Sequence, residues 1–251
     1  MENRIVTAGT IDVLEHELKN ANRDILVVFD CNGVLTANSD QIMNNCHRKI
    51  FKTLFQKHIS DKSGMVEFLS CMVSATPDRP VNERMPTIID DLQRRNVKVV
   101  VLTGLGANPF GKIKDPKKWR SDTLNDLGYH FENSWMSLGE KIFDDQSVYF
   151  KGIILCGGNA KSQCLKNFIE YANIKPKKIM FIDDSLKNLS DVSDFCRSRD
   201  ISFVGINYLE ADHLNSKRPF SEKRAEFQFK TFEENGVWLS DDEAEEKMSK
   251  K

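Results

Sequence analysis

The fold is decided by the stretch Leu26-Val27-Val28-Phe29-Asp30-Cys31-Asn32-Gly33-Val34-Leu35-Thr36. Its first four residues are apolar and include two valines, which predicts a strand buried on both faces. The strand ends at the carboxylate of Asp30, and Asn32-Gly33 then forces a turn. In open α/β sheets, ligands bind at the carboxyl ends of parallel strands, so Asp30 occupies a position where chemistry is common. The alternative is that Asp30 only caps the turn. Polar residues at the ends of other strands would favour a functional site over this alternative.

The length and composition are typical of a chain that can bury a full hydrophobic core. It has 251 residues, 40% of them hydrophobic, and a formal net charge of -1, so no global field favours nucleic acid or a membrane surface. Six cysteines occur without a C-x-x-C pair, which argues against a zinc site or a disulfide framework and fits a reducing compartment. No run approaches the roughly 18 apolar residues of a membrane span. We therefore expect a soluble, cytoplasmic protein without a transmembrane segment; its oligomeric state stays open.

Apolar strand patterns alternate with helical patterns along most of the chain. Because strands that alternate with helices form parallel sheets, this order predicts an α/β fold with a Rossmann-like, doubly wound parallel sheet. The predicted strands are residues 25–30, 97–102, 148–156, 178–182 and 201–206, and the helices between them are residues 85–95, 119–127, 160–173 and 186–199.

Residues 39–74 are helical in pattern and longer than a crossover between two strands requires. We therefore expect residues 39–80 to be a small helical cap inserted after the first strand. The core is then residues 1–38 and 81–239, including a closing helix at 221–235. Residues 240–251, acidic and then rich in lysine, are expected to be a disordered tail.

The predicted strand ends carry a coherent set of polar residues. Asp30 ends the first strand, Thr103 the second, and Asp183-Asp184 a later one, while Lys161 opens a helix between them. Three carboxylates at one edge repel one another, and Mg²⁺ removes this repulsion while keeping sites for water and a substrate phosphate. A hydroxyl and an ammonium are suitable partners for the phosphate. A carboxylate can also act as a nucleophile toward phosphorus.

This set resembles the haloacid dehalogenase superfamily over about residues 24–210. The resemblance is carried by four motifs in the expected order: Asp30-Cys31-Asn32-Gly33-Val34, the strand Val99–Thr103, Gly158-Asn159-Ala160-Lys161, and Phe181-Ile182-Asp183-Asp184 with Asn188 further on. The stretches Val204–Tyr208 and Gly236–Glu243 are further similar to a poorly characterised bacterial branch of the superfamily. That branch includes translocated effectors and is associated with protein-tyrosine phosphatase activity.

The resemblance implies a role for each matching residue. Asp30 is the expected nucleophile, and Thr103, Gly104 and Lys161 are expected to bind the transferring phosphate. Asp30, the main-chain carbonyl of Asn32, Asp183 and Asp184 are expected to hold Mg²⁺. The cap at 39–80 is expected to cover the site, and delivery into a host cell is expected from the resemblance alone.

Asn32 departs from the pattern of the superfamily, whose phosphatases carry an aspartate at this position as the general acid and base. An amide cannot transfer these protons, and losing such help costs about 10²–10⁴-fold in rate. A phenolate needs less help than an alkoxide, because the pKa of tyrosine is only about 10. Asn32 therefore favours aryl phosphates, or else a catalytically impaired protein. No residue clearly replaces the missing acid; His47 and Glu67 are weak candidates.

Two other sequence patterns resemble binding motifs. Gly106–Lys112 spells most of a Walker A loop, but Ile113 replaces the hydroxyl residue that binds Mg²⁺, so we interpret it as a chance match. The basic cluster at 112–120 is more typical of a solvated face than of a nucleic-acid site.

The sequence thus predicts a Mg²⁺-dependent phosphatase that acts on phosphotyrosine in proteins, or on small aryl phosphates, through an aspartyl-phosphate on Asp30. The alternative is a catalytically impaired binding or regulatory protein of the same fold. No nucleic-acid partner is expected.

Overall fold

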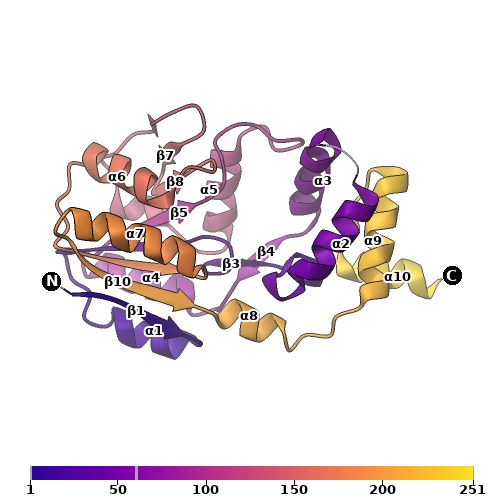
Figure 1. Ribbon diagram of the computed structural model, residues 1–251, viewed down its shortest axis with the longest axis horizontal. Helices are drawn as coiled ribbons and strands as arrows, with labels where there is room; N and C mark the ends of the chain where they lie inside the picture. The colour runs from indigo at the N-terminus through magenta and orange to yellow at the C-terminus, as the bar shows by residue number, and fades with distance from the viewer. Residues whose placement is uncertain (1, 60–61, 251) are drawn as a thin grey trace. The chain divides into compact units, whose positions relative to one another are not determined.

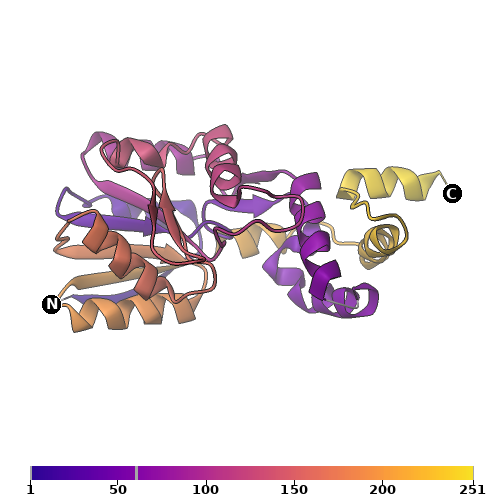
Figure 2. The same ribbon diagram turned by 90° about the horizontal axis from the view of Figure 1, so that it is seen from above.

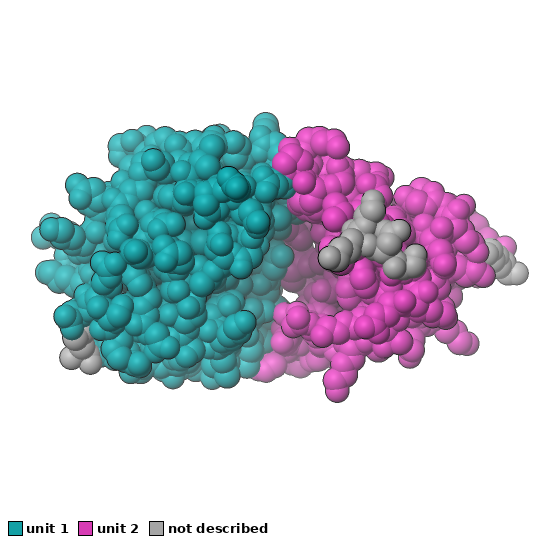
Figure 3. Space-filling view, turned by 45° about the horizontal axis from the view of Figure 1, so that its top comes forward, with its two compact units in different colours: residues 1–36, 80–108, 115–211 teal, residues 37–79, 109–114, 212–251 magenta. Residues whose placement is uncertain are grey.

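The computed structural model describes residues 2–59 and 62–250 of the chain. The chain forms two compact units, which Figure 3 distinguishes by colour. The α/β unit comprises residues 1–36, 80–108 and 115–211, and the helical unit comprises residues 37–79, 109–114 and 212–251.

An eight-stranded sheet forms the centre of the α/β unit. The strand order is β1-β10-β9-β2-β5-β8-β7-β6. The first six strands of this order are mutually parallel, and β7 and β6 add an antiparallel edge. The α/β class and the mostly parallel sheet predicted from the sequence are therefore confirmed. The strands are β1 Asn3–Ala8, β2 Ile25–Phe29, β5 Lys98–Thr103, β6 Lys141–Ile142, β7 Val148–Phe150, β8 Ile153–Leu155, β9 Lys178–Asp183 and β10 Ser202–Tyr208.

Helices cover both faces of this sheet (Figures 1 and 2). On one face, α6 (Lys161–Tyr171) and α7 (Leu186–Ser198) pack their apolar sides against Val28, Val100 and Phe181 in a fully buried core. On the other face lie α1 (Ile11–Leu18) and α4 (Met85–Arg94), and α5 (Pro116–Asp126) packs against β7 and β8. Burial on both faces explains why the central strands are continuous apolar runs.

Strand β2 lies at the point where the order of the sheet changes direction. The chain adds β5 and then β8 on one side of β2, and afterwards returns to add β9 and β10 on the other side. In parallel register, Phe29 lies opposite Val101 of β5 and Ile182 of β9. The carboxyl ends of β2 and β9 therefore border the topological switch point, where open α/β sheets bind their ligands.

The helical unit contains the insertion after β2 together with the C-terminal part of the chain. Its helices are η1 (Gln41–Met43), η2 (Asn45–His47), α2 (Arg48–His58), α3 (Lys62–Ala75), α9 (Glu222–Asn235) and α10 (Asp241–Ser249), while α8 (Glu210–Asn215) begins at its border. The short strands β3 (Thr36–Asn38) and β4 (Asp78–Pro80) pair where the insertion begins and ends. The core is aromatic, with the Phe68 ring 5.0 Å from that of Phe229 and 5.4 Å from that of Trp238.

These boundaries correct two expectations. Residues 221–235 were assigned to the core with the rest of 81–239, but α9 packs with α2 and α3 in the helical unit. The tail at 240–251 was expected to be disordered, but Asp241–Ser249 form α10, which starts with a capping box of Ser240 and Glu243. The apolar residues Trp238, Leu239 and Ala244 are buried around this helix. The segment therefore has buried apolar contacts, which its charged composition does not indicate.

Candidate functional site

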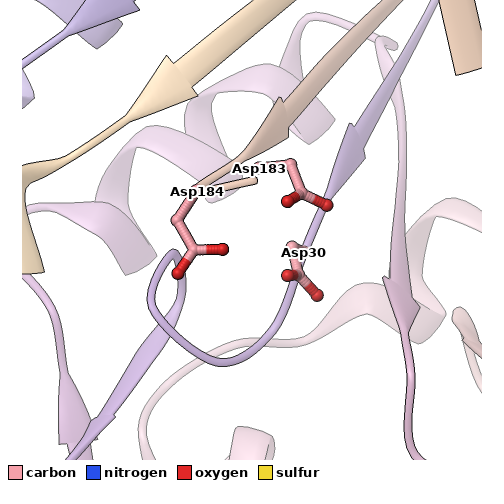
Figure 4. Close-up of side chains that lie close together, drawn as sticks. All are labelled: Asp30, Asp183 and Asp184. Atoms are coloured by element: carbon pink, nitrogen blue, oxygen red, sulfur yellow. The ribbon is translucent and has the colours of Figure 1, made fainter. Parts of the chain in front are cut away.

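Three carboxylates meet at the switch point of the sheet. Asp30 directly follows β2, Asp183 is the last residue of β9, and Asp184 comes next. Each offers an oxygen, and these oxygens lie within 4.8 Å of one another, as Figure 4 shows. Asp30 and Asp183 are buried. The structure therefore brings together the three acids that the sequence placed at the ends of separate strands.

The Lys161 ammonium is bound between two of these acids. Its Nζ lies 2.8 Å from Oδ1 of Asp30 and 2.7 Å from Oδ2 of Asp183. The side chain is only 8% exposed, and Nζ also lies 5.5 Å from the centre of the Phe181 ring. Lys161 is the first residue of α6, so the helix delivers the charge to the sheet edge.

The electrostatics of the cluster follow from its burial. Burial raises the pKa of Asp30 to about 6; Lys161 acts against this rise, and the charge of Asp183 adds to it. Burial alone would lower the pKa of Lys161, but the two carboxylates outweigh it, so this pKa is raised and the side chain is an ammonium.

Local hydrogen bonds hold the carboxylates in place. Oδ1 of Asp183 accepts from the Ser185 amide at 2.8 Å, and the Asn188 side chain donates to both oxygens of Asp183 at 3.1 Å. Oδ1 of Asp30 accepts from the Cys31 amide at 2.7 Å. The first turn of α7 and the turn after β2 thus fix the orientation of the two buried acids.

The turn after β2 reaches Asp184. Gly33 has a φ of +85°, and a Cβ at this position would lie 2.4 Å from Oδ2 of Asp184. Glycine is therefore required there both for the left-handed backbone and for the close approach. The Asn32 side chain is exposed, and its Oδ1 accepts from the Thr36 hydroxyl at 3.3 Å.

Thr103 and Gly104 lie at the end of β5, next to β2 in the sheet. Thr103 is 3% exposed, and its Oγ1 accepts from the Leu105 amide at 3.3 Å. Gly104 is exposed, and no atom lies within 4 Å of the position of an added Cβ. Both residues are at the same edge of the sheet as the carboxylates, with an open approach at Gly104.

The donor set suits a hard divalent cation. Three carboxylates whose oxygens lie within 4.8 Å of one another repel each other, and a bound cation relieves this repulsion. Carboxylate oxygens are the ligands that Mg²⁺ prefers, and Mg²⁺ uses few protein ligands together with water and phosphate oxygens. Asp30, Asp183 and Asp184 therefore fit the predicted cofactor by their chemistry.

The sequence pattern did not identify two polar residues near this site. Asp191 on α7 accepts hydrogen bonds from Ser162, the neighbour of Lys161. Asn207 on β10 lies opposite Asp183 in register, and its buried Oδ1 has no hydrogen-bond partner among residues 2–59 and 62–250. The signal for Asp191 was the absence of a capping side chain at Ala160. Asn207 could be found only from the register of the sheet.

The basic cluster at 112–120 is divided between the two compact units. Lys112 and Lys114 belong to the helical unit, whereas Lys117–Arg120 belong to α5. There, Lys117 pairs with Glu140, and Lys118 pairs with Asp122 at 2.5 Å.

Fold and site together define an α/β protein with a carboxylate-lined site at a sheet switch point. The chain belongs to the family described as "Protein of unknown function (DUF2608)", whose model matches residues 8–245. It is 23% identical to an uncharacterized protein of Rickettsia prowazekii (strain Madrid E), over 99% of this chain and 92% of that protein. It is 22% identical to an uncharacterized protein of Rickettsia bellii (strain RML369-C), over 84% of this chain and 77% of that protein.

No solved structure matches the chain with a significance comparable to that of these relatives. Among the described residues, no helix is both long enough and apolar enough to cross a lipid bilayer.

Proposed function

We propose that the chain is a Mg²⁺-dependent phosphatase of the haloacid dehalogenase type. The observation that carries this proposal is the position of Lys161, which lies within 2.8 Å of both Asp30 and Asp183 at the switch point, with Asp184 in the same cluster. A nucleophilic carboxylate, a fixed ammonium and a cation site at one sheet edge are the parts that phosphoryl transfer needs.

In the proposed reaction, Asp30 is the nucleophile. A bond forms from its carboxylate oxygen to phosphorus while the bond from phosphorus to the leaving oxygen breaks, which gives an aspartyl-phosphate. Lys161 and Thr103 bind the oxygens of the transferring group, and Gly104 leaves room for it. The oxygen of a water molecule then bonds to phosphorus while the bond from phosphorus to the Asp30 oxygen breaks, which restores the carboxylate and releases phosphate that carries the two protons of the water. The three acids and the main-chain carbonyl of Asn32 would hold Mg²⁺, which would supply positive charge against the phosphate.

The substrate class follows from Asn32. Its side chain accepts a hydrogen bond from Thr36, and its amide protons are not acidic enough to be transferred to an alkoxide. A phenolate leaves without this help far more readily than an alkoxide does, because its conjugate acid has a pKa of about 10. Aryl phosphates, and phosphotyrosine in proteins above all, are the proposed substrates.

A second candidate is a binding or regulatory protein of the same fold that turns over slowly or not at all. Asn32 favours this candidate too, because the missing acid and base also serves the hydrolysis of the aspartyl-phosphate. The sequence expectations of a cytoplasmic location and of delivery into a host cell stay predictions.

One experiment separates the two candidates. The purified chain is incubated with p-nitrophenyl phosphate and with glycerol phosphate, each with Mg²⁺ and with EDTA. We expect hydrolysis of the aryl ester that requires Mg²⁺ and that is lost in Asp30→Asn, whose folding is checked by its melting temperature. Absence of Mg²⁺-dependent turnover of either ester would reject the phosphatase and favour the binding protein.

A further inference from the structure

Helix α6 begins without a capping side chain of its own. Ala160 is at the N-cap position, and its methyl group cannot accept a hydrogen bond from the first turn. The first amides of a helix have no partner within the helix, so another group must satisfy them.

Asp191 of α7 takes the place of this cap. Its Oδ2 accepts from the Ser162 amide at 2.9 Å, and its Oδ1 accepts from the Ser162 hydroxyl at 2.8 Å. Both residues are partly buried. The carboxylate also faces the positive end of the α6 dipole, which favours a negative charge there. The cap of α6 is therefore supplied by a neighbouring helix and is bidentate.

This cap lies next to the residue that the site requires. Lys161 directly precedes Ser162, and its Nζ must meet Asp30 and Asp183 at 2.8 and 2.7 Å simultaneously. A lysine has a flexible four-carbon stem, so these two contacts depend on where its backbone begins. Fraying of the first turn of α6 would release the ammonium from both carboxylates.

Helix α7 controls the other side of the same ion pair. Asn188, three residues before Asp191, donates to both oxygens of Asp183. Residues three apart lie on the same side of a helix. One face of α7 thus orients the carboxylate of Asp183 and also fixes the start of the helix that carries Lys161.

We propose that Asp191 is a positioning residue for Lys161. It acts through Ser162, and it holds the ammonium in register with the carboxylates that α7 also orients. The position of Lys161 does not depend on the reaction proposed above; only the kinetic measurement below rests on the proposed function.

The direct test is the reactivity of Lys161. The variants Asp191→Ala and Asp191→Asn are acetylated with N-acetoxysuccinimide under native conditions, and the rate at each lysine is followed by mass spectrometry. We expect Asp191→Ala to raise the rate at Lys161 about fivefold, the change in local opening that loss of one helix cap produces. Asp191→Asn can keep both hydrogen bonds, so its rate is expected to stay closer to that of the wild type. The exposed Lys175 serves as the internal reference.

Asp115→Ala is the matched control. Asp115 caps α5 of the same unit by accepting from the Lys118 amide at 3.1 Å. Asp115→Ala therefore removes a similar cap from a different helix. We expect a similar fall in melting temperature without faster acetylation of Lys161. If Asp191→Ala lowers the melting temperature but leaves the rate at Lys161 unchanged, Asp191 is merely a stabilising residue and the proposal is wrong.

Two additions keep the test decisive. If Asp191→Ala does not fold, Asp191→Leu removes both bonds to Ser162 while keeping the volume of the side chain, and an unchanged rate at Lys161 in that variant overturns the proposal. Where aryl phosphatase activity is present, inhibition by inorganic phosphate is expected to weaken in Asp191→Ala and not in Asp115→Ala; equal weakening in both counts against positioning. If the wild type has no activity, the proposed function fails while the acetylation result still decides the role of Asp191.

Discussion

Gly33 packs directly against Asp184, so that a Cβ on Gly33 would lie 2.4 Å from the carboxylate oxygen Oδ2. The turn after β2 and the acid after β9 therefore approach each other closely. This contact joins the first motif of the sequence to the last, across the switch point of the sheet.

Gly33→Ala is expected to damage the site more than the fold. The new methyl group must displace Asp184, and the left-handed backbone at φ +85° adds about 1 kcal/mol of strain. We expect weaker Mg²⁺ binding by isothermal titration calorimetry, together with a modest fall in melting temperature. Gly236→Ala is the control, because Gly236 has a φ of +66° and no atom within 4 Å of an added Cβ. Equal Mg²⁺ affinity in the two variants would contradict the importance of the contact.

Lys161→Met is expected to make stability depend on Mg²⁺. Without the ammonium, Asp30 and Asp183 remain as buried like charges, and breaking a buried ion pair costs about 3–5 kcal/mol. Because a divalent cation restores the balance, Mg²⁺ should stabilise this variant more than it stabilises the wild type. Urea unfolding with Mg²⁺ and with EDTA measures the difference. An equal effect of Mg²⁺ on both proteins would mean that the cation does not bind between these acids.

The parts of the fold and of the site that could be predicted are those whose sequence pattern lies within one short segment of the chain. The central strands and the positions of Asp30, Asp183 and Asp184 followed from apolar runs that end in charged residues, and Lys161 was singled out at the start of a predicted helix. Strand β1 was missed, because four of the six residues of Asn3–Ala8 are exposed at the sheet edge and the strand lacks a continuous apolar pattern. Residues 148–156, predicted as one strand, form the hairpin β7–β8, in which Lys151 and Gly152 both have positive φ.

The missed parts of the site and of the helical unit depend on contacts between distant segments. Asp191 caps a helix that begins 30 residues before it in the chain, so no spacing rule could identify it. The same reason explains the error on the acidic tail. Asp241 is partly buried and is held by partners far away in sequence, namely Asp40 and Arg224. The composition of residues 240–251 predicted disorder, because composition carries no information about contacts with distant parts of the chain.

Asp241→Ala is expected to destabilise the helical unit. Arg224 is only 8% exposed and lies 2.8 Å from Oδ2 of Asp241, so the variant weakens the pairing of a buried charge at a cost of about 2–4 kcal/mol. Thermal unfolding and proteolysis within α10 provide the measurement. Asp242→Ala is the matched control, because Asp242 is the exposed neighbour in the same first turn of α10. The expectation is wrong if both variants have the same melting temperature.

Asp40→Asn is expected to change how stability depends on pH. Burial raises the pKa of Asp40 from 3.8 to about 6, although Trp238 and the Asp241 amide donate to its carboxylate. A folded pKa above the unfolded one means that the contribution of Asp40 is fully present below about pH 4 and is lost as the pH rises to about 6, on the order of 3 kcal/mol. The asparagine cannot titrate, and its amide group faces three donors, which come from Trp238, Asp241 and Gln228. The variant should therefore be less stable than the wild type, by more at pH 4 than at pH 7 in urea unfolding. A difference independent of pH would exclude titration of Asp40 in this range.

Asn32→Asp is expected to widen the range of substrates. Asn32 is exposed beside the nucleophile and is linked to Thr36, so an aspartate fits the same place without new burial. It would supply the proton that an alkoxide needs as it leaves, which raises the rate about 10²–10⁴-fold. The rate with a phenolate leaving group depends much less on this proton. The ratio of kcat/KM for glycerol phosphate to that for p-nitrophenyl phosphate should therefore rise in the variant. Asn32→Ala removes the hydrogen bond to Thr36 without adding an acid, and it should leave this ratio unchanged. Equal gains on both esters in Asn32→Asp would contradict the leaving-group argument and, with it, the reason to favour phosphotyrosine.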